Sequence, residues 1–516
     1  MMQKSNHFPP PAADLEASPR RLGRRELLQA AAAGLGMAPL MHGAAKAQGA
    51  GAAGVFADGF EPAGEPLFAW GSGADSGALQ GDVWTPGRDA EGRVNAVSWD
   101  RVPRGRWIEV AGTRIDQQLT AAVQALSPGW DRGSLWGAES GPGFNLFQSW
   151  SGFCVDPRRD RFWFLGGGHS DGYNNGLYRF DCQRMQWSVE CPPSARAQMS
   201  AAYLSNGSST NYPDSAAAAV ANFNANNPAG TTAGPLVPAE NGPFYDQVPF
   251  DGKPTARHTY EGLAYAPEVG ARGSIFMHAR RLWRFDLASG RWEWKRLVND
   301  RVRGNPASPN ATGVVEIHAA ESALGLWDEV RGRVLCSASG SLGAGAFAFR
   351  WDTQAWEPWG GSYGLNFNHA AQSRHGRIVT AFQPPFSDSS VGRGRYWRLD
   401  LDSGQMLQDY VQLGGGLGLS AFVSASTFYD GAAMVFVPPR NRFWVCTRAS
   451  ASAGVGDMQW LELDPSRTPW TLSRLSFPNP HPVARRVIAG RLRWMPNLNA
   501  VLVWDHCFVN AFLFRF

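Results

Sequence analysis

Residues 152–187 read GFCVDPRRDRFWFLGGGHSDGYNNGLYRFDCQRMQW, and this stretch decides the fold. Two short apolar runs, a glycine triplet, an aromatic-Arg-aromatic-Asp segment and a closing Trp follow one another in it. Each apolar run has the length of a β-strand and is bounded by turn residues. The stretch therefore predicts one unit of antiparallel β-strands.

The same pattern recurs along the chain, which is the signature of a repeat architecture. Five further copies begin near Gly262, Leu326, His375, Gly431 and Gly490. The last copy lacks its closing strand, whereas an unmatched strand of that type occurs at Arg106–Gly112. Joining the two completes a ring of six four-stranded sheets, which removes the exposed sheet edges that an open array would leave.

The repeated Gly-Gly, aromatic-Arg-aromatic-Asp and Trp resemble kelch repeats, of the galactose-oxidase-like β-propeller superfamily. The resemblance covers about residues 105–516 and implies an all-β, six-bladed kelch-type β-propeller, although seven blades are also compatible with the pattern. We expect an N-terminal strand around Trp107 to pair with the last strand around Phe512. The resemblance specifies the fold rather than the function, because propellers carry many unrelated activities.

The composition agrees with a turn-rich β-protein. A hydrophobic fraction of 44% excludes global disorder, and 59 Gly with 35 Pro disfavour a helical bundle. The 22 Trp are unusually many. Indole rings in such numbers either pack repeated β-units together or offer flat faces to sugar rings.

The N-terminal region resembles a twin-arginine (Tat) export signal. Arg24-Arg25 precedes a weakly apolar run over 30–40 and an Ala45-Lys46-Ala47 cleavage site. We therefore expect a signal peptide at 1–47, an N-terminal extension at 48–104, the propeller at 105–516, and a periplasmic or secreted location.

Removal of residues 1–47 takes away six of the 48 Lys/Arg and three of the 44 Asp/Glu and leaves a net charge of +1. This charge predicts no nucleic-acid partner. No later stretch is long and apolar enough to predict a membrane span. We expect a monomer whose partner is a polysaccharide or oligosaccharide.

The six cysteines do not form a disulfide framework or a zinc motif, since no CxxC spacing occurs. Cys182 and Cys191 are close in sequence. A disulfide between them in an oxidising compartment is only a guess. In a propeller, the loops between the second and third strands open on the same face as the connections between blades. We expect the site on that face, beside a long inter-blade insert at 191–257 that is a candidate lid.

Six of the eight histidines after residue 47 fall on this one predicted rim, and they are His169, His258, His278, His318, His369 and His506. One hypothesis is a divalent metal held by rim histidines, with His278 and His506 as candidate ligands. The alternative is that these histidines hydrogen-bond backbone carbonyls around the channel. The cofactor stays unknown from the sequence.

The sharpest local motif is Arg257-His258-Thr259-Tyr260-Glu261-Gly262. On a strand, His258 and Tyr260 share one face. An imidazole and a phenol together suit β-elimination from a uronic acid, in which one group abstracts the C5 proton and another protonates the leaving oxygen. Arg485-Arg486 stand at the equivalent place in the last repeat and can clamp the carboxylate.

This interpretation predicts a polysaccharide lyase. The predicted catalytic residues are His258, Tyr260, His169 and Arg486. The predicted substrate-binding residues are Arg257, Asp171, Tyr173, Asn174, Asn175, Arg485, His318 and His369.

Two other functions stay open. One is a non-catalytic propeller that binds carbohydrate or protein. The other is a copper-dependent, galactose-oxidase-like oxidase, which needs two Tyr, two His and a Tyr–Cys cross-link. The Tyr-His dipeptide of that family is absent here, and Cys154, the best-placed strand cysteine, has no obvious tyrosine partner.

Overall fold

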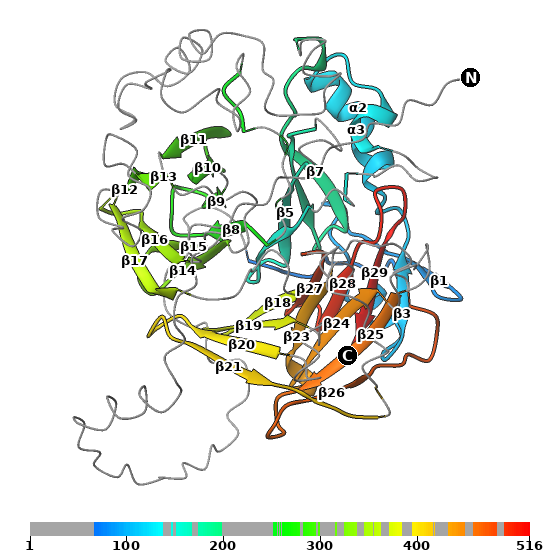
Figure 1. Cartoon of the computed structure of the whole chain (residues 1–516). Helices are drawn as coiled ribbons and strands as arrows, with labels where there is room; N and C mark the ends of the chain where they lie inside the picture. Colours follow the sequence, from blue (N-terminus) through cyan, green and yellow to red (C-terminus); the bar gives the residue numbers. More distant parts are fainter. Residues whose placement is uncertain are drawn as a thin grey trace, which may run out of the picture. The chain divides into compact units, whose positions relative to one another are not determined.

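The computed structural model describes residues 67–137, 146–147, 151–167, 174–198, 251–254, 256, 259, 261–278, 282–295, 298–299, 315–316, 325–337, 345–353, 355–362, 371–383, 395–415, 417, 432–448, 458–481 and 490–516. The strands among these residues form sheets that are mainly antiparallel (Figure 1). The predicted Tat signal and most of the long insert lie outside the described residues.

Six sheets of four or more strands form the six blades of a β-propeller, which confirms the predicted fold class and blade number. Blade 1 consists of β4 (Phe153–Asp156), β5 (Arg161–Leu165), β6 (Leu177–Asp181) and β7 (Gln186–Cys191). Blade 2 consists of β8 (Leu263–Ala266), β9 (Ser274–His278), β10 (Leu282–Asp286) and β11 (Arg291–Lys295). Blade 3 consists of β14 (Gly325–Asp328), β15 (Arg333–Ser337), β16 (Gly345–Arg350) and β17 (Ala355–Ser362).

The second half of the chain repeats this arrangement. Blade 4 consists of β18 (Ala371–His375), β19 (Ile378–Gln383), β20 (Arg395–Asp400) and β21 (Met406–Tyr410). Blade 5 consists of β23 (Ala433–Val437), β24 (Arg442–Arg448), β25 (Met458–Asp464) and β26 (Thr471–Arg474), with β22 (Gln412–Leu413) added in parallel to β26. Blade 6 contains β27 (Leu492–Met495), β28 (Ala500–Val503), β29 (Ala511–Arg515) and β3 (Trp107–Val110). The short strands β12 (Val298–Asn299) and β13 (Val315–Glu316) pair separately.

The ring closes in blade 6 as expected from the sequence. β3 pairs antiparallel with β29, with Trp107 opposite Phe514 and Glu109 opposite Phe512. The N-terminal extension adds two strands to this blade, β1 (Ala78–Gln80) and β2 (Val83–Thr85), and β2 pairs in parallel with β3. The outer edge of β3 is therefore covered rather than left open.

The described residues include three α-helices that the sequence pattern did not predict. They are α1 (Ala96–Asp100), α2 (Ile115–Leu126) and α3 (Arg132–Trp136). α2 buries Ile115, Leu119 and Val123 on one face. Its Gln118 side chain accepts a hydrogen bond of 2.6 Å from the backbone N–H of Trp187 in β7. The helix thus protects the outermost strand of blade 1 from further strand pairing.

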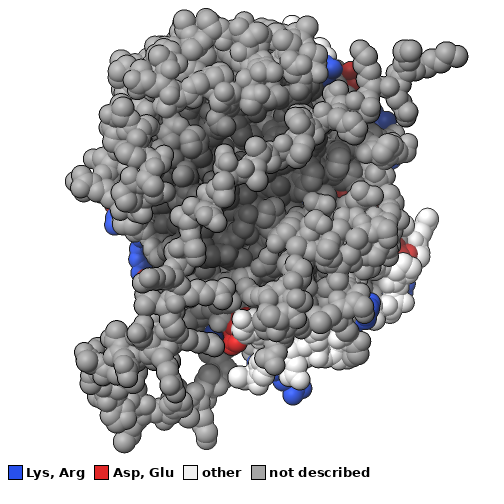
Figure 2. Space-filling view, in the orientation of Figure 1, with Lys and Arg blue, Asp and Glu red and all other residues white. Residues whose placement is uncertain are grey.

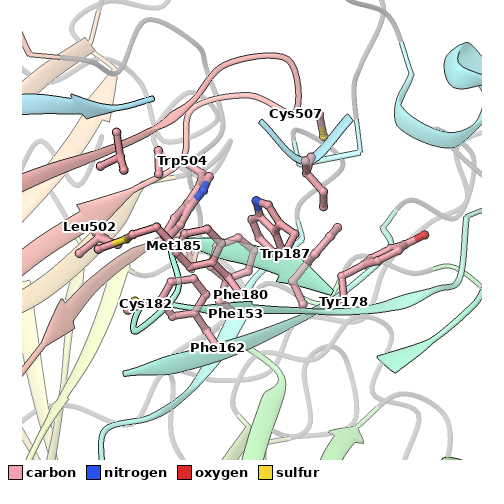
Figure 3. Packing of buried hydrophobic residues seen from close by; sticks show 14 of the residues in the cluster. Phe153, Phe162, Tyr178, Phe180, Cys182, Met185, Trp187, Leu502, Trp504 and Cys507 are labelled. Carbon is pink, nitrogen blue, oxygen red and sulfur yellow. The ribbon is translucent and has the colours of Figure 1, made fainter. Parts of the chain in front are cut away.

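Apolar contacts join each blade to both of its neighbours, which explains why strands such as β5 are buried along their whole length. Phe162 and Phe164 of β5 face blade 6, where the Phe162 ring meets the Trp504 ring at a centroid distance of 4.7 Å (Figure 3). Trp163 points to the other side and stacks on Tyr265 of blade 2 at 4.7 Å. The many aromatic residues therefore serve blade packing in this region.

The guessed disulfide between Cys182 and Cys191 is wrong in this structure, because both cysteines are free. They lie at opposite ends of the β6–β7 hairpin, where Asp181 pairs with Gln186 and Leu177 pairs with Cys191. Cys182 packs with blade 6 and Cys191 packs with blade 2. The hairpin separates them by more than a disulfide can span.

Among the described residues, we find no helix with the length and apolarity that a bilayer crossing requires.

Candidate functional site

The innermost strands of the blades begin at one end of the propeller, and hydrogen bonds join these beginnings to one another. Phe153 N–H donates to the carbonyl of Gly490 at 3.1 Å, and Gly152 N–H donates to Oγ1 of Thr259 at 2.9 Å. Gly325 N–H donates to the carbonyl of Glu261 at 2.9 Å. We call this set (Gly152, Thr259, Glu261, Gly325 and Gly490) the channel rim.

Gly325 has to be a glycine at this rim. A Cβ atom at this position would lie 2.4 Å from the carbonyl carbon of Gly262, which no real side chain tolerates. The backbones at the beginnings of blades 2 and 3 therefore approach each other closely, and the rim is held by main-chain contacts rather than by side-chain packing alone.

An ion pair ties three blades together beside the rim. Arg493 of β27 donates from Nη2 to the carbonyl of Phe153 at 2.6 Å and forms an ion pair with the carboxylate of Glu261. The Glu261 side chain is 14% exposed. Burial raises the pKa of Glu261, while the neighbouring Arg493 opposes that rise. Blades 6, 1 and 2 thus share one charged contact although Glu261 and Arg493 are far apart in the sequence.

Arg491, at the start of β27, is completely buried. Its Nη1 donates to the carbonyls of Trp504 and Asp505 at 2.5 and 2.9 Å, and its guanidinium carbon lies 5.6 Å from the Phe147 ring. Nε and Nη2 have no hydrogen-bond partner among the described residues. Burial lowers the pKa of Arg491 to about 10, with Asp505 opposing the shift, so the side chain stays a cation at neutral pH. A buried cation with unused donors favours an anionic ligand.

His506 lies in the loop between β28 and β29, and it is 1% exposed. Its Nδ1 accepts a hydrogen bond of 3.1 Å from the backbone N–H of Phe508. An imidazole that accepts at Nδ1 carries its proton on Nε2. Metal ligation through Nδ1 would therefore require this hydrogen bond to break. The predicted metal role of His506 stays a prediction.

Asn174 and Asn175 are completely buried at the beginning of β6, and protein groups engage both side chains. Asn174 donates to the carbonyl of Leu135 at 3.0 Å, and its Oδ1 accepts from the hydroxyl of Tyr178 at 2.8 Å. Asn175 donates to Oγ of Ser194 and to the carbonyl of Pro254, each at 2.8 Å. This arrangement gives them a visible structural role, and their predicted role in substrate binding is untested.

The two ends of the long insert meet at Asn175. Ser194 N–H donates to Oδ1 of Asn175 at 2.8 Å, and Lys253 Nζ donates to the carbonyl of Pro192 at 2.9 Å. The two ends of the candidate lid therefore lie together, next to the β5–β6 connection. The greater part of the insert, 199–250, lies outside the described residues.

Most of the predicted site residues also lie outside the described part of the chain, so their roles stay predictions. They are His169, Asp171, Tyr173, Arg257, His258, Tyr260, His318, His369, Arg485 and Arg486. His278 is in β9, but its side chain is not described. Within the 257–262 motif, the described residues Thr259 and Glu261, which flank Tyr260 in the sequence, belong to the channel rim.

Glu261, Arg491 and Arg493 are not among the site residues that the sequence predicts. A signal was available for the two arginines, because Gly490-Arg-Leu-Arg places two cations at alternate positions of an apolar strand and hence on one face. No sequence pattern indicates that Glu261 meets Arg493, since the contact depends on how blades 6 and 2 meet across blade 1.

Nothing among the described residues identifies a metal centre, because they contain no group of three or more His, Cys, Asp or Glu side chains that could hold an ion. Cys154 is a buried free thiol. Its Sγ lies 3.9 Å from the carbonyl of Trp163, and burial raises the pKa of this thiol to about 12. On the face drawn in Figure 2, the described charged side chains lie mainly along the periphery with both signs interspersed.

Comparisons with known proteins assign no family to the chain. No protein-family model matches it, and no curated protein matches it. Solved structures with a similar fold include TolB from Acinetobacter baumannii, with a TM-score of 0.30, 8% identity, and 60% of this chain and 50% of that chain covered. The chain thus spans half the length of that protein.

Two other solved structures show a similarly distant likeness. Kuenenia stuttgartiensis hydrazine synthase has a TM-score of 0.34 and 8% identity, with 73% of this chain and 77% of that chain covered. A luciferin-regenerating enzyme has a TM-score of 0.32 and 8% identity, with 71% and 90% covered. Such values carry no argument about function, and the six-bladed propeller rests on the strand order of this chain itself.

Proposed function

We propose that this protein is an exported, carbohydrate-active propeller that binds a uronate-containing polysaccharide at the channel rim and cleaves it by β-elimination. The observation that carries the proposal is Arg491, a fully buried guanidinium beside the rim with two N–H positions that no described residue accepts. A substrate carboxylate at the rim would be attracted by the positive charge of Arg491, although burial keeps Nε and Nη2 out of direct contact with it.

The proposed reaction uses residues of the 257–262 motif, in which Thr259 and Glu261 belong to the channel rim. His258 takes the proton from C5 of the uronate, and the C4–O glycosidic bond breaks as the C4–C5 double bond forms. Tyr260 returns a proton to the leaving oxygen. The arginines Arg485, Arg486 and Arg491 neutralise the carboxylate, which makes the C5 proton more acidic. Sugar units along the same glycan would contact other groups of this face.

The first experiment measures the unsaturated product by its ultraviolet absorbance, on a panel of acidic polysaccharides. His258→Ala and Tyr260→Phe should each lower kcat by ~10²–10⁴-fold, the usual contribution of a general acid or base. Their melting temperatures should stay close to that of the wild type. Normal turnover in a well-folded His258→Ala protein would rule out this assignment.

The second experiment separates substrate binding from folding. Arg491→Gln should raise KM for a charged polysaccharide, most strongly at low ionic strength. Arg515→Gln is the matched control, because Arg515 is a buried arginine of the same blade whose donors bond to the carbonyls of Trp99 and Val102. It should lower stability and leave KM unchanged. Equal KM values in all three proteins would contradict a carboxylate at Arg491.

The same preparations distinguish the other two functions. A wild-type protein that binds the acidic glycan without forming an unsaturated product would be a binding propeller. Stoichiometric copper together with oxidation of a sugar alcohol would instead identify an oxidase. Either result would overturn the elimination reaction.

A further inference from the structure

The segment 67–102, which precedes β3, contacts two blades at once, and blade 1 is the first of them. Val94 N–H donates to the carbonyl of Gln183 at 2.8 Å. The Gln183 side chain in turn donates from Nε2 to the carbonyl of Ala69. Because Gln183 lies in the turn between β6 and β7, these bonds attach the segment to blade 1.

The same segment is bound to blade 6 through Arg515, the last residue of β29. Arg515 donates from Nη1 to the carbonyls of Trp99 and Val102 at 2.5 and 3.2 Å. Its guanidinium carbon lies 5.0 Å from the centroid of the Trp99 ring, and its Nη2 lies 3.1 Å from a carboxylate oxygen of Asp100. The segment therefore has a separate attachment on each blade.

Aromatic rings join the two attachments into one packed unit. Trp70 stacks on Trp99 at a centroid distance of 5.5 Å, and Trp99 meets Trp84 edge-on at 5.6 Å. Trp84 and Trp99 are buried. Both belong to a single hydrophobic cluster with residues of blade 1 and of blade 6, among them Phe162, Met185, Leu498 and Trp504. Burial of apolar surface therefore also holds the segment on both blades.

The segment crosses the seam between blades 6 and 1 at the end opposite the channel rim. Cys182 N–H donates to the carbonyl of Asp160 at 3.1 Å, so the β6–β7 turn lies beside the β4–β5 turn, away from the rim. Sγ of Cys182 lies 3.7 Å from Sδ of Met495 in blade 6. The rim end of the seam has its own bond, from Phe153 N–H to the carbonyl of Gly490.

We propose that residues 67–102 act as a clasp that keeps the seam between blades 6 and 1 closed. Release of this clasp opens the seam at the end opposite the rim, while the seam between blades 1 and 2 stays closed. The pairing of β3 with β29 joins strands within blade 6 and does not by itself hold blade 6 against blade 1. The clasp is independent of the reaction proposed at the channel rim.

Two native cysteines report on the two seams that flank blade 1. Cys182 belongs to the cluster between blades 6 and 1 (Figure 3), and Cys154 belongs to the cluster between blades 1 and 2. Both are buried free thiols. A thiol reagent reaches such a side chain only when the surrounding structure opens, so the rate of modification measures the opening of that seam.

The test is alkylation of the full-length native protein, with peptide mass spectrometry assigning a rate to each cysteine. Trp70→Ala truncates a half-buried ring of the clasp. It should raise the rate at Cys182 at least about tenfold and leave the rate at Cys154 unchanged. Arg515→Gln removes the attachment to blade 6 and should have the same effect. An effect in only one of the two variants would overturn the proposal, because the Trp70 ring could then simply cover the thiol.

Trp292→Ala is the matched control, because it truncates another half-buried Trp, one that packs against the cluster containing Cys191. It should accelerate the modification of Cys191 and leave that of Cys182 unchanged. If it accelerates Cys182 as strongly as Trp70→Ala does, the effect is not specific to the clasp. Equal acceleration of Cys182 and Cys154 in the clasp variants would show general loosening, and an unchanged rate at Cys182 would show that the seam holds without the clasp. Each of these three results would overturn the proposal.

Discussion

Asp160 is a buried carboxyl group in the turn between β4 and β5, at a residue whose φ of 48° falls in the left-handed region. Its Oδ2 accepts a hydrogen bond of 3.0 Å from the backbone N–H of Leu498, so the side chain joins blade 1 to blade 6. Burial raises the pKa of Asp160 to about 8, while hydrogen bonds from Asn497 and Leu498 oppose that rise. The folded protein therefore holds this proton more tightly than the unfolded chain does.

This raised pKa predicts a specific pH dependence of stability. The contribution of Asp160 is complete below its ordinary pKa of 3.8 and is lost as the pH rises toward about 8. The slope is at most ~1.4 kcal/mol per pH unit. Asp160→Asn stays neutral and tolerates the left-handed backbone. The stability of this variant relative to the wild type should therefore increase between pH 5 and pH 8, as measured by urea unfolding.

Asp402 is the control, because its pKa is lowered rather than raised. A hydrogen bond from Arg377 lowers the pKa of Asp402, so this carboxyl is ionised in both states between pH 5 and pH 8. Asp402→Asn should change stability by the same amount at both pH values. If the stability difference between Asp160→Asn and the wild type is the same at pH 5 and at pH 8, Asp160 does not titrate in this range.

At the scale of elements, Asn175 joins the beginning of β6 to both ends of the long insert. Loss of its hydrogen bonds to Ser194 and Pro254 would leave buried polar groups without partners. We expect Asn175→Ala to lower the free energy of unfolding by ~2–3 kcal/mol. Ser403→Ala is the control, because its hydrogen bond from the backbone N–H of Gln405 is exposed, and it should cost less than ~1 kcal/mol. Denaturant titration compares the two, and equal losses would contradict a structural role specific to Asn175.

Several inner strands were predictable from the sequence because they are buried on both faces and therefore read as short apolar runs. Arg161–Leu165 and Met458–Asp464 are examples, and both are strands in the structure. The helix over 115–126 was missed, since its apolar residues occupy a single face within a stretch that lacks the repeat. β1 and β2 were missed because they are very short.

The candidate site was less predictable than the strands, for a physical reason. The pairing of Glu261 with Arg493 and the burial of Arg491 depend on how separate blades pack together. Local patterns contain no information on such contacts.

At the scale of the whole molecule, the two ends of the propeller segment are held together by β3 and β29. A covalent link at this seam tests the closure in the intact protein. Glu109→Cys combined with Phe512→Cys places two thiols on directly opposed positions. Their disulfide would close a loop of roughly 400 residues, for which loop-closure entropy suggests a stabilisation of up to ~5 kcal/mol.

The expected result is a higher unfolding midpoint in the oxidised double variant than in its reduced form. Either single variant should show no such redox dependence, because the described native cysteines are buried and free. A double variant that does not form the bond, or gains no stability from it, would contradict the register of Glu109 opposite Phe512.

The pairing of β3 with β29 also fixes an order of events at the ribosome. β3 is synthesised first, and its partner strand follows only after roughly 400 further residues. At elongation rates of ~5–20 residues per second, this delay is on the order of 20–80 s. Throughout that interval the edge of β3 lacks its partner strand, and once blade 1 has been made, its face that packs against blade 6 stays uncovered. Translation of the last blade is therefore the step that covers this strand edge and closes the ring.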